Sequence, residues 1–146
     1  MPTATRKKKT LRKQVDDLAV ALQKLVRLKA AVHEGKNGLI KCVSCPKWGH
    51  WKDMQGGHWI ERTKQATKVI EEIIHPQCPG CNGFGMKYST EVRENYRKYM
   101  HEMYGEDQCD QWLIESNKPA NHFGPDIEEE TKRVKALCRE LEKQVA

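Results

Sequence analysis

Four cysteines stand in two Cys-x-x-Cys pairs, which are the residues of this 146-residue chain most suited to metal chemistry. Each such turn points both sulfurs at one centre, and two turns supply the four thiolates of a tetrahedral Zn²⁺ site. A zinc with four cysteine ligands has no open position for water, so any catalysis must come from residues between the pairs. The predicted ligands are Cys42, Cys45, Cys78 and Cys81.

The 32 residues between the two pairs contain a histidine in the stretch 55-QGGHWIER-62. A neutral imidazole is a suitable general base near pH 7, so His58 is a candidate to activate water. Gly56 and Gly57 remove side chains where a phosphate would have to approach, and Trp59 is expected to pack on the opposite face. The alternative is a structural histidine. The other histidines outside the second cysteine motif have no comparable setting and are interpreted as surface or packing residues: His33, His50, His101 and His122.

The positive charge is concentrated towards the N-terminus. Residues 1–47 carry +9, residues 48–100 carry +2 and residues 101–146 carry −5, for a total of +6. A basic arm such as 6-RKKKTLRK-13 suits phosphate contacts, although a solvated tail explains the same run. A polyanion is therefore the partner that the charge favours.

Composition predicts one folded domain, with 38% hydrophobic and 32% charged residues. The sequence lacks a long apolar run and a secretory signal pattern, so we expect a soluble intracellular protein that does not enter a membrane. Thiols stay reduced in that compartment, which favours metal ligands over disulfides. Cys109 and Cys138 stand alone and are interpreted as buried thiols.

Apolar residues at helical spacing predict four helices. We expect them over residues 10–33, from Ser89 to Gly105, over 107–117, and from Pro125 or Asp126 to the end. Residues 39–51 are expected to form a zinc knuckle leading into a hairpin, with 51–60 as its returning strand, and 63–74 to be mostly irregular.

Three motifs in order, 42-CVSC-45, 56-GGHW-59 and 75-HPQCPGCN-82, resemble the NinG (Rap) recombination proteins of lambdoid phages, within the HNH or His-Me finger nucleases. The resemblance implies a ββα-metal core in which the second strand of a hairpin carries His58 as general base. It implies that Asn82, on the following helix, holds a catalytic Mg²⁺ or Mn²⁺. It also implies cleavage of branched DNA, of the Holliday-junction or D-loop type, by a phage-encoded protein in the cytoplasm of the bacterial host.

The chain departs from the family pattern at two positions. Gly57 stands where many HNH enzymes have an aspartate ligand, and Ile73 stands where the family usually has an asparagine. Other side chains that could complete the site are His75, Glu61, Glu72 and Asp53. After the histidine, Arg62, Lys64 and Lys68 are the predicted phosphate contacts, although solvated charges explain them too.

The sequence thus predicts a small α+β fold with three segments in one compact domain: 1–38, a basic arm and amphipathic helix; 39–88, a zinc-stabilised ββα-metal core; and 89–146, a helical region. The first hypothesis is a metal-dependent, structure-specific DNA endonuclease. The second is a non-catalytic zinc-containing DNA-binding protein on the same scaffold. The third is an interaction factor whose N-terminal helix pairs with a partner or with itself as a homodimer.

Overall fold

The first helix, α1, runs from Leu11 to Glu34, as the apolar spacing predicts. The Thr10 hydroxyl accepts a hydrogen bond from the Lys13 amide at the start of the helix, and Gly35 ends it with a left-handed φ of 59°. The computed structural model describes residues 8–145, so the first two residues of the basic arm predicted for 6–13 lie outside the described part.

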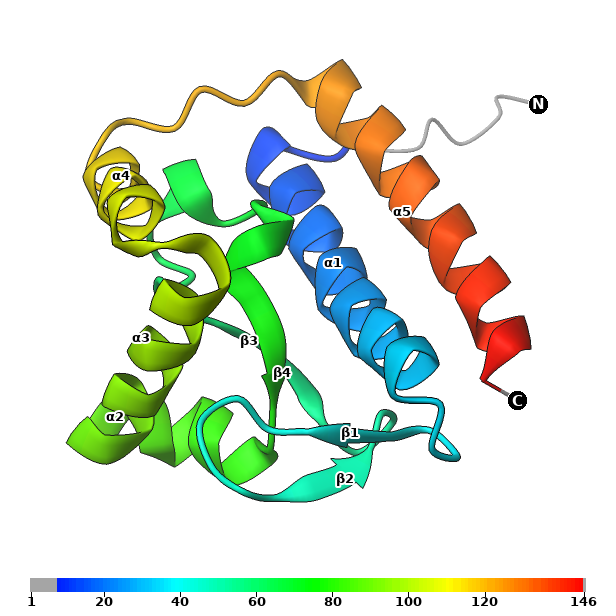
Figure 1. Cartoon of the computed structure of the whole chain (residues 1–146). Helices are drawn as coiled ribbons and strands as arrows, with labels where there is room; N and C mark the ends of the chain where they lie inside the picture. The colour runs from blue at the N-terminus through cyan, green and yellow to red at the C-terminus, as the bar shows by residue number, and fades with distance from the viewer. Residues whose placement is uncertain (1–7, 146) are drawn as a thin grey trace.

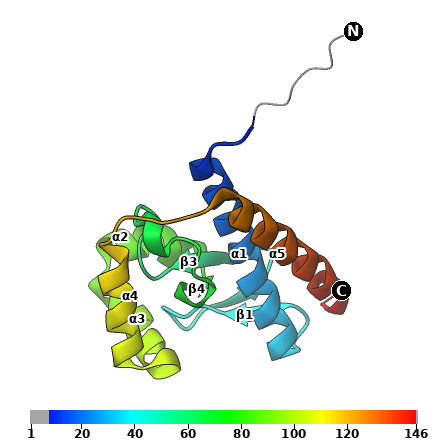
Figure 2. The ribbon, with the colours of Figure 1, turned by 90° about the horizontal axis from the view of Figure 1, so that it is seen from above.

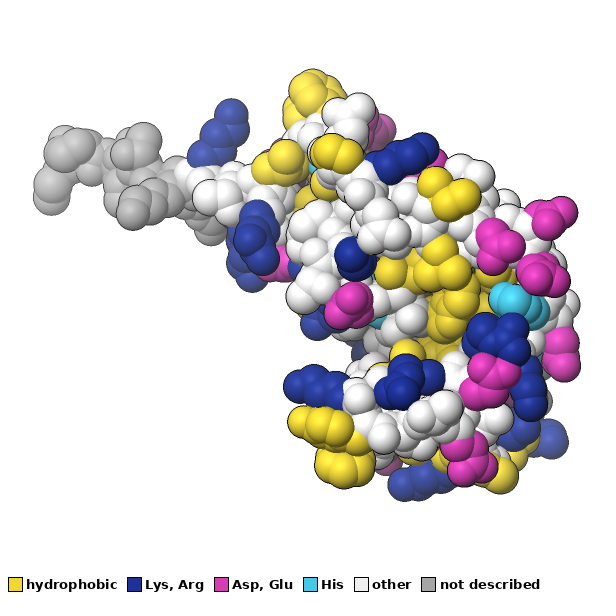
Figure 3. Space-filling model, turned by 90° about the vertical axis from the view of Figure 1, so that its left-hand side faces the viewer, with side chains coloured by type: hydrophobic (Ala, Val, Ile, Leu, Met, Phe, Trp, Pro, Cys, Tyr) yellow, Lys and Arg dark blue, Asp and Glu magenta, His cyan; other side chains and the backbone are white. Residues whose placement is uncertain are grey.

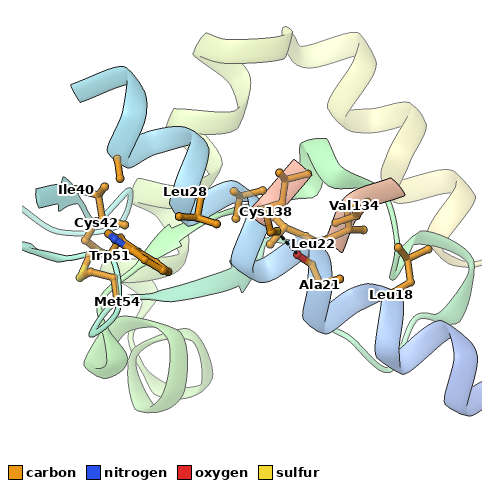
Figure 4. Close-up of a cluster of buried hydrophobic side chains, with 14 of the residues drawn as sticks. Leu18, Ala21, Leu22, Leu28, Ile40, Cys42, Trp51, Met54, Val134 and Cys138 are labelled. Atoms are coloured by element: carbon orange, nitrogen blue, oxygen red, sulfur yellow. Dashed lines mark hydrogen bonds between the residues drawn. The ribbon is translucent and has the colours of Figure 1, made fainter. Parts of the chain in front are cut away.

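The apolar stripe of α1 is buried within the chain itself. Helix α5, Gly124–Gln144, lies along one side of α1, and the β-strands lie on the other (Figures 1 and 2). Figure 4 shows Leu18 and Leu22 of α1 close to Val134 and Cys138 of α5. The stripe is therefore part of the core. Packing against α5 and the strands explains the apolar face of this helix, which was the basis of the third hypothesis, without a partner helix.

Four short strands form two separate antiparallel pairs. Strand β1, Leu39–Lys41, pairs with β2, Trp48–His50, and strand β3, Gln55–His58, pairs with β4, Ile74–Gln77. The prediction that residues 51–60 form the strand that pairs with the one leading into the first cysteine pair is therefore wrong. Residues 39–50 close their own hairpin, and β3 pairs with the strand that leads to the second cysteine pair.

His58 lies at the end of β3, which is the first strand of its pair and not the second as expected. The connection to β4 holds only two 3-10 turns, η1 (Gln65–Thr67) and η2 (Glu71–Ile73), which agrees with the irregular structure predicted there. After β4 the chain enters a π-helical turn, η3 (Cys81–Gly85), and continues as α2 (Met86–Tyr88). Two paired strands are thus followed directly by a short helical segment.

Two further helices cover the opposite side of the β3–β4 pair from α1 (Figure 1). Helix α3, Thr90–Tyr104, starts at a Ser89 cap, and α4, Glu106–Ser116, follows Gly105, both as predicted. They form a second core around Tyr96, Met100 and Cys109. Met103 of α3 is 55% exposed and is not part of this core. No helix among residues 8–145 combines the length and hydropathy needed to cross a membrane.

Candidate functional site

The four predicted zinc ligands converge. All four Sγ atoms lie within 4.8 Å of one another, and Cys45 Sγ is 3.8 Å from Cys78 Sγ. Around a tetrahedral Zn²⁺ with Zn–S bonds of about 2.3 Å, neighbouring sulfurs are about 3.8 Å apart. The cluster therefore fits a structural metal such as zinc, and it joins the end of β1 to the end of β4 and the start of η3.

Local backbone contacts shape both cysteine turns. The amide of Ser44 points at Cys42 Sγ over 3.4 Å, and the amide of Cys81 points at Cys78 Sγ over 3.5 Å. Burial raises the pKa of the Cys42 and Cys81 thiols. A bound cation would reverse this effect because it favours the thiolate form, so metal binding here is expected to release protons.

His58 is held in one orientation and, in consequence, in one tautomer. Its side chain is 7% exposed, and Nε2 lies 2.9 Å from the carbonyl oxygen of Lys68. A carbonyl only accepts, so Nε2 must carry the proton and Nδ1 must carry the lone pair. Nδ1 is buried and has no hydrogen-bond partner. The imidazole thus presents a free acceptor.

Burial lowers the pKa of His58 to about 4, and the nearby positive charges of Arg62 and Lys68 act in the same direction. The imidazole is therefore neutral at pH 7, which is the form that accepts a proton. An anionic phosphate close to the ring would favour the protonated form and so raise this pKa.

The two glycines before His58 make room for the protein itself. A Cβ on Gly56 would lie 2.7 Å from the Cα of Gln23, so the absence of a side chain lets α1 approach β3 closely. A Cβ on Gly57 would overlap the side-chain oxygen of Gln77. The expectation that these glycines clear space for a phosphate is corrected: internal packing explains both.

Asn82 lies in η3, one residue after the last cysteine, and opens onto the same cleft as His58. The cleft has a volume of about 850 Å³ and is lined by residues of α1, β3, the loop after β3, η3, α2, α3 and the end of α4. Figure 3 shows a hollow on the face of the molecule formed by α2, α3 and α4, with Lys and Arg side chains on both sides. The structure thus brings together the two residues predicted for catalysis.

Basic side chains outnumber acidic ones in the lining of this cleft. Arg62 and Lys64 come from the loop after His58, and Lys87 and Arg93 come from the opposite side; Glu61 is the acidic residue of the lining. Lys87 and Arg93 were missed in the sequence because they follow the second cysteine pair at no recognisable spacing. Such a cleft is suited to a polyanion.

Lys68 has a different environment from the other predicted phosphate contacts. Its side chain is 8% exposed and forms an ion pair with Asp16 of α1, and this contact lowers the pKa of Asp16. Lys68 is thus a buried link between α1 and the loop that holds His58. It does not line the cleft.

Tyr96 joins the strands beneath the site. It is completely buried, and its hydroxyl donates to the carbonyl of Gly57 at 2.6 Å and lies 3.2 Å from the carbonyl of Ile73. The Ile73 side chain is itself buried. The Tyr96 hydroxyl therefore connects the backbone at Gly57 with the backbone at Ile73, the two positions at which the sequence differs from the pattern described above.

Of the four side chains left open as further ligands, Glu61 alone lines the cleft. His75 is enclosed by aromatic rings, with its ring centroid 4.9 Å from that of Tyr99, and its Nε2 lies 3.0 Å from the Tyr104 hydroxyl and 2.8 Å from the Glu72 carbonyl. Burial lowers the pKa of His75. These contacts assign His75 to packing.

Of three comparisons with known proteins, one gave a match, and it extends over almost the whole chain. A search of curated proteins and a search of solved structures gave no match. The family described as bacteriophage lambda NinG protein matches residues 2–144. The chain therefore belongs to the NinG family, which is linked to phage recombination.

Proposed function

We propose that this protein is a metal-dependent DNA endonuclease acting on branched recombination intermediates. The observation that carries the proposal is that His58 lines a cleft together with basic residues and Asn82, while its Nε2 donates to the Lys68 carbonyl and its buried Nδ1 has no partner. The family's link to recombination supports the branched substrate.

In this proposal His58 Nδ1 accepts the proton of the water that attacks the phosphodiester. The Lys68 carbonyl keeps the ring oriented and stabilises the imidazolium that forms. Arg62 and Lys64 hold the DNA backbone on one side of the cleft, and Lys87 and Arg93 hold it on the other. A bound Mg²⁺ or Mn²⁺ would stabilise the charge that develops on the phosphate and the leaving oxygen, with Asn82 as one of its oxygen ligands.

The cysteine cluster has a separate role. Zn²⁺ held by four thiolates has no free position, so it would fix β1, β4 and η3 relative to one another without taking part in hydrolysis. Asn82 follows Cys81 directly, so the same metal would also fix where the cleft residue stands.

The test compares cleavage of linear, forked and four-way DNA by the parent protein, His58→Ala and His33→Ala. We expect His58→Ala to lower the cleavage rate by at least about 100-fold, because a general base contributes ~10²–10⁴. His33 is exposed and outside the cleft, so its variant should cleave like the parent. Omission of Mg²⁺ and Mn²⁺ from the zinc-loaded protein should stop cleavage.

DNA binding is measured in parallel without added Mg²⁺ or Mn²⁺, so that chemistry is separated from affinity while the structural zinc stays bound. Full activity of His58→Ala would contradict the proposal. A parent protein that binds branched DNA but cleaves none of the substrates with Mg²⁺ or Mn²⁺ would favour the second function, a non-catalytic DNA-binding protein on the same scaffold.

A further inference from the structure

Two aromatic side chains in contact with each other are exposed to solvent. Phe84 and Tyr88 are 73% and 70% exposed, the highest values among the large hydrophobic side chains of residues 8–145. Their ring centroids are 4.7 Å apart, with 47° between the ring planes. Neither ring belongs to either of the two cores. A single exposed aromatic residue is common, but two in contact form a surface patch, and such a patch indicates a binding surface.

The aromatic pair belongs to the segment that forms one edge of the cleft. Phe84 lies in η3 and Tyr88 is the last residue of α2. In the same segment Asn82, Met86 and Lys87 line the cleft. Figure 3 shows exposed hydrophobic side chains next to Lys or Arg side chains at the lower edge of the hollow. The pair therefore stands beside the cleft, on its outer side.

The backbone that carries the two rings is held at both ends. Arg93 of α3 donates to the carbonyl oxygens of Met86 and Lys87, each at 3.2 Å. At the other end η3 begins with Cys81, which belongs to the cysteine cluster. The rings are thus fixed in place without being buried, so a ligand that contacts them orders little of the chain on binding.

The charge beside the pair favours nucleic acid as its partner. Lys87 precedes Tyr88 directly, and basic residues outnumber acidic ones in the lining of the cleft. A DNA backbone held by these cations brings its bases next to the rings. Aromatic side chains stack on the face of any base, whatever the sequence. In a continuous duplex the neighbouring base pairs cover these faces, whereas a branch point interrupts the stack and leaves faces free.

We propose that Phe84 and Tyr88 stack on the bases left unstacked at the branch point, and that this contact selects branched over linear DNA. The inference deepens the proposed function and rests on it. The cations of the cleft contact phosphates, which linear and branched DNA both have, so they hold DNA without recognising a branch. The aromatic pair supplies a contact that linear duplex cannot make.

The experiment measures binding of the zinc-loaded, full-length protein to forked DNA with unpaired arms and to linear duplex of equal length, by fluorescence anisotropy without added Mg²⁺ or Mn²⁺. The double variant Phe84→Ala/Tyr88→Ala should bind forked DNA about tenfold or more weakly, because stacking on one base contributes roughly 5- to 150-fold. Its affinity for linear duplex should stay close to that of the parent. The slope of log K against log salt should not change, because no phosphate contact is lost.

A second pair of variants separates stacking from apolar contact. Phe84→Leu/Tyr88→Leu keeps apolar side chains but removes the rings, and it should lose as much affinity for forked DNA as the alanine variant. Phe84→Tyr/Tyr88→Phe keeps both rings and should bind as the parent does. With 2-aminopurine beside the branch point, the parent should quench the fluorescence of this base by stacking on it, and the leucine variant should not.

The matched control is Phe123→Ala, which removes another exposed aromatic side chain, 64% exposed and outside the lining of the cleft. It should keep the preference of the parent for forked DNA. Thermal unfolding is measured for each variant to show that it is folded.

Two results would overturn the assignment. One is a folded alanine variant that prefers forked over linear DNA as strongly as the parent does; if sedimentation then shows that this variant has lost self-association, the patch contacts a second copy of the chain. The other is a leucine variant that binds and quenches like the parent, because the contact would then be apolar and not stacking.

The two proposals fail in different ways. Loss of the preference for forked DNA in the alanine variant of a protein that cuts no DNA would support the base contact and remove the endonuclease. DNA cleavage that depends on His58, with a preference for branched DNA unaffected by residues 84 and 88, would support the endonuclease and remove the aromatic pair from substrate selection.

Discussion

The cysteine cluster and the His58 cleft are adjacent through η3, which contains Cys81 of the cluster and Asn82 of the cleft, and they differ in how complete they are. The cluster brings four like ligands within 4.8 Å using two local turns, and each turn is shaped by its own backbone amides. The cleft is assembled from parts of α1, β3 and the loop after it, η3, α2, α3 and the end of α4, and one of its lining residues, His58, has a buried nitrogen without a partner.

This difference corresponds to what each site has to hold. A structural metal is enclosed by the protein alone, so its ligands are complete within the chain. A site that receives a substrate must keep a reactive atom free, and His58 Nδ1 is free in this sense. A buried atom without a partner costs folding free energy, and the cluster is expected to supply the stability that tolerates this cost.

The largest expected effect comes from breaking the cluster. Cys81→Ser, or removal of zinc with a strong chelator, should abolish the cooperative thermal unfolding transition, because a structural zinc contributes ~10–16 kcal/mol in small zinc domains. That amount equals or exceeds the whole stability of a typical domain, about 5–15 kcal/mol. Circular dichroism and bound zinc content provide the measurement.

Cys138→Ala is the matched control for this change, because Cys138 is buried between α5 and α1 but does not belong to the cluster. It should lose a small part of the stability and keep all the zinc. A chelated protein that melts like the zinc-loaded one would show that the four thiols need no metal.

A smaller effect is expected from pH, and it arises in the cleft. His58 has a pKa of about 4 in the folded protein, against 6.5 for an ordinary histidine. Between these values the unfolded chain binds a proton that the folded protein does not, so stability falls as the pH decreases from about 6.5 to 4. At pH 5 the loss relative to pH 7 is about 2 kcal/mol.

His58→Gln removes this titration, so its urea unfolding free energy should change less between pH 7 and pH 5 than that of the parent. The comparison of the two proteins cancels the contribution of the cysteine cluster, which also loses metal at low pH. His33→Gln, at an exposed position, should keep the slope of the parent. Equal slopes for parent and His58→Gln would mean that His58 is accessible to protons in the folded protein.

The parts of the molecule that depend on neighbouring residues could be predicted from the sequence. The stripe and caps of α1 give its bounds, and the Cys-x-x-Cys turns give the cluster, because both signals act within a few residues. Cys109 and Cys138 are buried, as their isolated positions indicate.

The parts that depend on strand pairing could not be predicted. Strands of three and four residues carry almost no periodicity, and proline, here Pro76 within β4, is disfavoured inside strands, so no strand was predicted there. The link of Tyr96 to Gly57 and Ile73 follows from the packing of α3 on the strands. The sequence around these three residues contains no motif that predicts this contact.

The smallest expected effect separates two cations that are equivalent in the sequence. Arg62 is exposed in the lining of the cleft, whereas Lys68 is buried and paired with Asp16. Arg62→Gln should weaken DNA binding several-fold and reduce the slope of log K against log salt by about 0.9, the value of one phosphate contact. Lys68→Met should leave that slope unchanged and lower the unfolding free energy instead, because Asp16 loses its partner. Fluorescence anisotropy over a range of salt concentrations measures the slope, and urea unfolding measures the stability. A reduced slope for Lys68→Met would mean that the ion pair opens when DNA binds, which would place Lys68 on the DNA-binding surface with Arg62.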